Sequence, residues 1–229
     1  MKYNRLPHPV FTQHRQRFMA QLKSNSIAVF NSNDTYPISA DSTLPFEQHR
    51  DLFYLTGIDQ EETIVVLCPD AKDSSLREVV FVKETNAHIA VWEGHKLTQT
   101  EATKVSGVST VKWTSEFEDH FLSLAKEVEH IYVNTNEHYR ANVETQTRED
   151  RFIEWCKTKF PTHNYEKSNL ILQGLRAVKD PEEIEHIQTA CDITENGFRR
   201  VLGFVKPGVW EYEIEAEYAH EFLRNRSKG

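Results

Sequence analysis

Runs of apolar residues separated by polar, turn-forming stretches divide the first 170 positions into short segments. Four of these segments are rich in β-branched or aromatic residues and are bounded by charged or turn-forming residues, which is the pattern of buried strands. They are SIAVF (26–30), ETIVVLCPD (62–70), REVVFVKE (77–84) and HIYVNTNE (130–137). We expect the second and third of them to be neighbours in one sheet.

Helical spacing and helix-capping residues fill the intervals between these strands. A Ser or Thr followed three residues later by Glu predicts a helix start, because each side chain can accept a hydrogen bond from the other residue's backbone. Four helices are predicted: over 12–25, after Thr98 with Glu101, after Ser115 with Glu118, and over 148–160, before Pro161. Interleaved strands and helices predict an α/β domain with a mixed sheet and flanking helices over residues 1–170.

The remaining residues, 171–229, have a different pattern. Asp180, Pro181 and Glu183 form a helix start, and an apolar stripe follows at steps of three and four. Its members are Ile184, Ile187, Cys191, Thr194, Phe198, Val201 and Val205. A closing helix carries Ile214, Tyr218 and Phe222 on one face. Two such helices without strands predict the first layer of a second, incomplete domain whose sheet is not in this sequence.

Composition and charge exclude several classes of protein. The 229 residues include 35 acidic and 27 dispersed basic ones, for a net charge of −8, which argues against a nucleic-acid partner. The longest apolar run, Ile64–Cys68, is too short to cross a bilayer, and no export signal is recognised, so we expect no membrane partner. An odd number of cysteines, three, predicts a reducing, cytoplasmic compartment.

Motif searches yield little local chemistry. No glycine-rich phosphate loop or nucleophile elbow is present. Glu217 and His220 have the spacing of dimetal helix bundles, but there is no second copy, and Arg224 replaces the second His of an H-E-x-x-H motif. A solvated helix face is the more frequent explanation, so we expect no metal ligand and no catalytic residue in this chain.

Two stretches contain unusual side chains. VWEG (91–94) places Trp92 before a turn, and a lone Trp is most often half-buried at a domain edge. SADSTLPFEQHRDLFYLTG (39–57) has Asp41, His49, Arg50 and Asp51 among aromatic residues. Its composition predicts a loop and a strand with a polar rim, and a pocket there is possible.

These two stretches also carry a family resemblance. Residues 39–67 and VWEGHKLTQTEA (91–102) are similar to the N-terminal domain of the creatinase/aminopeptidase P group, whose members include the Xaa-Pro aminopeptidases. LRAVKDPEEIEHIQTACDITENGF (175–198) and the residues up to 225 resemble the opening of that group's catalytic, pita-bread domain. The resemblance implies that residues 1–170 form the N-terminal domain and that 171–229 begin a truncated pita-bread domain.

The resemblance implies a function for the longer protein. It would be a metallopeptidase that releases the N-terminal residue before proline, using two divalent metals, usually manganese, bound by residues that would follow Gly229. The chain alone would then be inactive. Family members are oligomers in which an Asp of the S-A-D motif and a Trp of the W-x-G motif lie near a neighbouring subunit's substrate pocket. Asp41 and Trp92 match those positions, so proline-containing peptides and a homo-oligomer are the expected partners.

Other functions stay open at this stage. A prolidase or a creatinase-like hydrolase would share the fold, although the DLFYLTG and VWEG pair favours aminopeptidase P. A pita-bread relative that has lost its metal ligands would serve instead as a binding module. Such a protein, if complete at residue 229, should place polar residues on its last two helices, whereas their stripes are apolar, and for this reason we favour a truncated peptidase.

Overall fold

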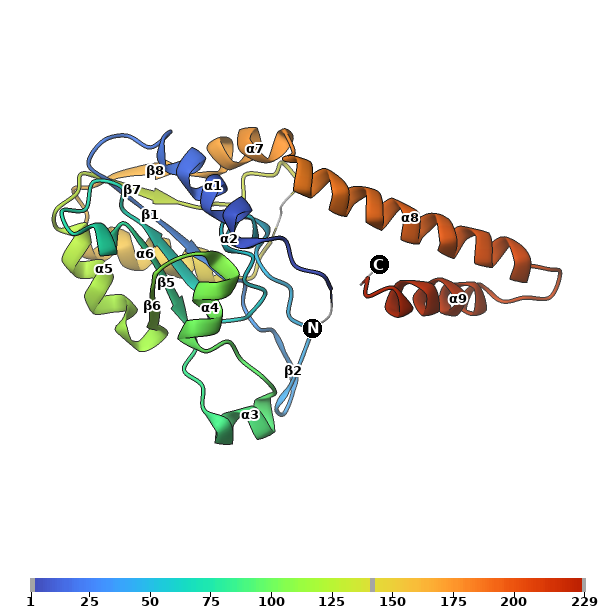
Figure 1. Ribbon diagram of the computed structural model, residues 1–229. Helices are drawn as coiled ribbons and strands as arrows, with labels where there is room; N and C mark the ends of the chain where they lie inside the picture. Colours follow the sequence, from blue (N-terminus) through green and yellow to red (C-terminus); the bar gives the residue numbers. More distant parts are fainter. Residues whose placement is uncertain (1–2, 141–142, 228–229) are drawn as a thin grey trace. The chain divides into compact units, whose positions relative to one another are not determined.

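The computed structural model describes residues 3–140 and 143–227. Its contacts divide the chain into two compact units (Figure 1). One comprises Pro7–Ala177, and the other comprises Val178–Gly229 together with Met1–Leu6. Each unit is described by itself below.

A six-stranded mixed sheet forms the centre of the unit Pro7–Ala177. The strands are β1 (Ser26–Asn31), β4 (Ile64–Leu67), β5 (Glu78–Val82), β6 (Thr110–Trp113), β7 (His130–Val133) and β8 (Asn164–Lys167), in the order β6-β5-β4-β1-β7-β8. The pairs β1–β4 and β4–β5 are antiparallel, whereas β5–β6, β1–β7 and β7–β8 are parallel. The predicted α/β class, the mixed sheet and the pairing of the second and third predicted strands are therefore confirmed.

Helices cover both faces of this sheet. One face carries α1 (His8–Met19), α2 (Arg50–Thr56), α4 (Gln99–Ser106) and α7 (Asn169–Ala177), and the other carries α5 (Phe117–Ala125) and α6 (Arg148–Lys159) (Figure 1). Side chains alternate along a strand, so β1 sends Ile27 and Val29 into the core under α5 and α6, and Ala28 and Phe30 into the core under the other helices. The result is a three-layer sandwich with two buried cores.

The helix-start and helix-end signals in the sequence predicted some helix boundaries correctly and others incorrectly. The capping box of Thr98 and Glu101 opens α4, and α6 ends at Lys159 before Pro161, as predicted. The predicted cap at Ser115 with Glu118 is wrong, because a short 3-10 turn, η2 (Thr114–Glu116), comes first and the Glu116 carboxylate instead accepts from the Trp113 backbone N–H. The helix predicted over 12–25 begins earlier, after Pro7, because proline suits a first turn that needs no N–H.

The second unit contains two α-helices among its described residues. They are α8 (Pro181–Phe204) and α9 (Glu211–Arg224), and the predicted capping box of Asp180 and Glu183 opens α8. Gly197 of α8 lies against the Tyr218 ring, where an added Cβ would approach the ring to 2.9 Å. The small side chain therefore lets the two helices approach closely.

The predicted apolar stripe of α8 is only partly buried. Val201 is buried, whereas Ile184, Ile187 and Phe198 are 56%, 48% and 54% exposed. α9 contributes no buried residue. Among the described residues, no helix is both long and apolar enough to cross a membrane.

Candidate functional site

Asp41 lies at the tip of a two-stranded hairpin that extends from the sandwich. The hairpin consists of β2 (Pro37–Ser39) and β3 (Ser42–Thr43), and its turn is formed by Ala40 and Asp41, with Ala40 at a φ of 50°. Among the described side chains, no hydrogen bond or ion pair engages the Asp41 carboxylate, which is exposed. It is therefore available to a ligand or to another chain.

Trp92 lies on a second projection, the short helix α3 (Ala87–Glu93). The Asn86 side chain caps α3 by accepting from the backbone N–H groups of His88 and Ile89, both at 2.9 Å, and Gly94 ends it with a φ of 77°. Trp92 is 81% exposed and the neighbouring Val91 is 75% exposed. The expectation of a half-buried Trp is wrong, because no residue of α3 is buried and the described part of the chain leaves most of the indole exposed.

Ion pairs hold both ends of the α3 projection to one loop. On the incoming side, Lys83 pairs with Glu62 at 3.2 Å and with Glu93 at 3.0 Å. This partner lowers the pKa of the Glu93 carboxyl below its ordinary value. On the outgoing side, Lys96 pairs with Glu61, and the two side chains are largely buried. The exposed Trp92 is thus carried on an anchored segment.

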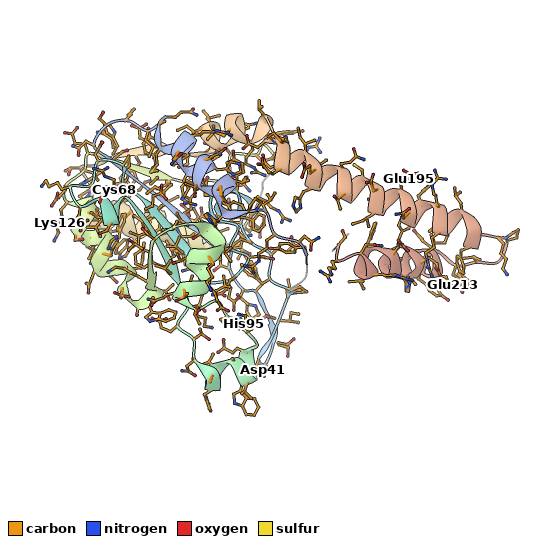
Figure 2. The ribbon with its side chains drawn as sticks, viewed as in Figure 1. Asp41, Cys68, His95, Lys126, Glu195 and Glu213 are labelled. Atoms are coloured by element: carbon orange, nitrogen blue, oxygen red, sulfur yellow. The ribbon has the colours of Figure 1, made fainter. Side chains whose placement is uncertain are left out.

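The structure does not join Asp41 to Trp92 directly. Among the described residues, no hydrogen bond or ring contact links the two side chains. Figure 2 shows Asp41 and His95, which follows α3, in the same lower part of the view, beyond the central sheet. Both predicted substrate-facing residues are therefore exposed on extensions of the sandwich.

The N-terminus of α2 carries a polar network that the sequence indicated only by its composition. Where the sequence predicts a loop and a strand, residues 50–56 form a helix capped by His49, whose Nδ1 accepts from the Asp51 backbone N–H at 3.3 Å. Burial lowers the pKa of His49 below its ordinary value. The Asp51 carboxylate accepts from Arg176 Nη1 at 2.7 Å and from Asn134 Nδ2 at 3.0 Å. Asp51 therefore connects α2 with α7 and with the loop after β7.

Two acidic residues of α9, Glu213 and Glu217, have partners within the helical unit. Arg200 of α8 pairs with Glu217, and the Glu213 carboxylate accepts from the Trp210 backbone N–H at 2.7 Å, which caps α9. His220, which has metal-ligand spacing from Glu217, is exposed. Both carboxylates therefore already have partners within the helix pair.

Comparisons with known proteins identify the family of this chain. The family model described as "Aminopeptidase P, N-terminal domain" matches residues 11–132, more than half of the chain. The Xaa-Pro aminopeptidase of Escherichia coli (strain K12) is 26% identical over 219 residues, covering 95% of this chain and 49% of that protein. The Xaa-Pro aminopeptidase of Haemophilus influenzae is 24% identical over 224 residues, covering 96% of this chain and 49% of that protein.

A solved structure gives the same result for the fold. A single-residue variant of Escherichia coli aminopeptidase P superposes with a TM-score of 0.82 at 25% identity, covering 96% of this chain and 50% of that one. The chain thus spans about half the length of the relatives it matches. With a matching family model over most of the sandwich and relatives that align with nearly all of its residues, the chain belongs to the aminopeptidase P family and contains its N-terminal domain.

Proposed function

We propose that this chain is the N-terminal part of a metal-dependent Xaa-Pro aminopeptidase, which releases the N-terminal residue that precedes proline. The observation that supports this most is the alignment of almost the whole chain with relatives named Xaa-Pro aminopeptidase. Residues 1–170 would form the N-terminal domain and residues 171–229 would open the catalytic domain. This division lies close to the change of compact unit at Val178.

The metal centre of the proposed enzyme would lie outside these 229 residues. Escherichia coli aminopeptidase P has been solved in a zinc-substituted form with product. We propose two divalent ions, with manganese the expected metal, which together would activate water and polarise the scissile carbonyl. The best-spaced residues here, Glu217 and His220, do not fit that role, since Glu217 pairs with Arg200. The chain alone should therefore be inactive.

Asp41 and Trp92 would contribute to substrate binding from a neighbouring subunit of a homo-oligomer. The exposure of both side chains on projections supports this, because among the described residues neither has a hydrogen-bond or ion-pair partner that would compete. An indole face would complement the flat apolar ring of proline, and a carboxylate would complement a peptide's charged N-terminus. We also propose a cytoplasmic location, which the three free cysteines support.

The test is hydrolysis of an Xaa-Pro peptide with added Mn²⁺ by this chain and by the longest product of its reading frame. We expect cleavage by the longer product, loss of cleavage with a chelator, and no cleavage by the 229-residue chain. Cleavage by the 229-residue chain alone would contradict the proposal that the metal centre lies outside these residues. An inert longer product would favour a binding module, and preference for free Xaa-Pro dipeptides would favour a prolidase.

Variants of the longer product test the two substrate-facing residues. Trp92→Ala and Asp41→Asn should each lower kcat/KM by at least about tenfold, roughly 1.4 kcal/mol of transition-state binding. Val91→Ala is the matched control, because Val91 is equally exposed on the same helix. Sedimentation of each variant separates lost assembly from lost binding. Unchanged kinetics in Trp92→Ala and Asp41→Asn would remove both residues from the site.

A further inference from the structure

A cavity of about 570 Å³ opens in the sandwich unit at the carboxyl ends of β1 and β7, beside the start of α6. These two strands are parallel neighbours, and β1 pairs on its other side with the antiparallel β4. In α/β sheets, small ligands commonly bind at the carboxyl ends of parallel strands. The cavity is lined by the residues after both strands (Asn31–Asp34 and Asn134–Asn136), by Tyr36, Leu44, Pro45, Glu47, His49 and Val143, and by Thr147–Asp150.

The first turn of α6 places a guanidinium in this cavity. Arg148 Nη1 donates to Ser32 Oγ at 3.2 Å, and among the described residues no carboxylate forms an ion pair with it. Asp34, another acid of the lining, accepts from the Arg148 backbone N–H and pairs with Arg151. Burial lowers the pKa of Arg148, although the charges of Glu62 and Asp34 oppose this effect. Several N–H donors of the guanidinium therefore stay available.

The next residue places a carboxylate in the same cavity. Glu149 accepts from Asn31 Nδ2 at 2.9 Å and from the Asn134 backbone N–H at 3.0 Å. Within the described part of the chain, no cation pairs with it, and burial raises its pKa to about 7. Among the described residues, a ligand cation could therefore pair with this carboxylate without displacing a salt-bridged side chain, although the Arg148 charge lies in the same cavity.

A buried acceptor beside Glu149 lacks a partner. Asn134 is only 5% exposed, and its Nδ2 donates to Asp51, but within the described ranges its buried Oδ1 accepts no hydrogen bond. An unsatisfied buried acceptor costs about 1–3 kcal/mol, so a donor from a ligand would be favourable there. Asn134 also lines the cavity, so its amide lies close to the place where a ligand donor would enter.

The remaining acids of the wall are engaged. Glu47 pairs with Arg50 at 3.0 Å, and Asp150 caps α6 by accepting from Thr147. Since the first N–H groups of α6 are used by Asp34 and Thr147, a simple anion site at the helix start is disfavoured. What the cavity offers is one unpaired positive group and one unpaired negative group, side by side, with apolar walls from Leu44, Pro45 and Val143.

We propose that this cavity binds the zwitterion of a free apolar α-amino acid. The ligand carboxylate would accept from the Arg148 guanidinium. The ligand ammonium would donate to the Glu149 carboxylate, and the apolar side chain would lie against Leu44, Pro45 and Val143. Each charged group of the ligand would thereby meet a group of opposite sign that has no ion-pair partner among the described residues.

The test is calorimetric titration of the 229-residue chain with L-leucine, N-acetyl-L-leucine and L-leucinamide. Each of the two analogues lacks one charge of the zwitterion. We expect L-leucine to bind at least about tenfold more tightly than either analogue. Equal binding of leucinamide would indicate a plain cation site and equal binding of N-acetyl-leucine a plain anion site. Either result, or no binding of leucine at millimolar concentration, overturns the proposal.

Variants locate the binding. Arg148→Gln and Glu149→Gln should each weaken L-leucine binding by at least about tenfold. Lys157→Gln and Glu154→Gln are matched controls, because they remove the same charges from exposed positions of α6 outside the cavity. Circular dichroism confirms that every variant is folded, and amide NMR shifts at Asn31 and Asn134 report the site directly. Leucine affinity that is the same in Arg148→Gln and Glu149→Gln as in the controls would contradict the assignment.

Discussion

The sandwich and the helical pair use the same kind of amphipathic pattern with different results. In Pro7–Ala177, the apolar residues of strands and helices fill two cores, with residues such as Phe121 and Leu52 fully buried. In the helical pair, Phe198 stands on an equally regular stripe but is 54% exposed. An apolar stripe therefore shows that a helix has a face to bury, whereas burial itself depends on whether a partner surface is present.

The largest expected effect tests this contrast directly. Phe121→Ala should lower the free energy of unfolding of the sandwich by about 3–5 kcal/mol, since its ring contacts Phe117, Phe152, Trp155 and Phe160. Phe198→Ala should change stability by about 0.5 kcal/mol or less, because its ring is largely in water. Urea unfolding followed by circular dichroism measures both. Equal losses would mean that the two regions are buried to the same degree.

Ion pairs provide a second comparison of the sandwich with the helical pair, with a somewhat smaller expected change in stability. Arg15 of α1 is fully buried and donates to Glu78 at 2.7 Å, to the Leu55 carbonyl at 2.8 Å and to the Ser106 carbonyl at 2.9 Å. Arg15→Met should cost about 3 kcal/mol, because these three acceptors lose their donors. Arg200→Met, which removes the pair with Glu217 on the helical pair, should cost about 1 kcal/mol or less. A larger loss from Arg200→Met in thermal unfolding would contradict this ranking.

The smallest expected effect concerns pH. The pKa of Glu149 is raised from 4.5 to about 7 in the folded chain, so between these values the folded state holds a proton that the unfolded state has released. The free energy of unfolding should therefore fall as pH rises through this window and level off above it. Glu149→Gln should lack this component, whereas Glu154→Gln should keep it. Urea midpoints at pH 5 and pH 8 test the difference, and parallel curves for wild type and Glu149→Gln would contradict it.

Local sequence signals predicted the parts of this fold that local interactions determine. The boxes of Thr98 with Glu101 and of Asp180 with Glu183 need only neighbouring residues, and both form as expected. The edge strands β6 and β8 were missed, because TVKW and NYEK are half polar, as edges that face water can be.

The candidate sites were less accessible to sequence reasoning. α2 was missed because a seven-residue helix shows hardly two turns of periodicity. The bonds from Asp51 to Asn134 and Arg176 join residues 83 and 125 positions apart, and only the sheet topology brings them together. The cavity beside Arg148 and Glu149 depends in the same way on the parallel pairing of β1 with β7.

The position of β1 in the sheet also has a kinetic consequence. This strand is complete at Asn31, yet its parallel neighbour β7 pairs Ser26 with His130, about a hundred residues later. Contacts between residues so far apart in the sequence slow folding. The entropy cost of closing a long loop comes before the strand pairing contributes any favourable free energy. During synthesis, the edge of β1 that pairs with β7 would therefore stay unpaired until β7 has left the ribosome. We expect refolding of this unit on the millisecond-to-second scale of non-local sheets, with β1 and β7 acquiring amide protection together.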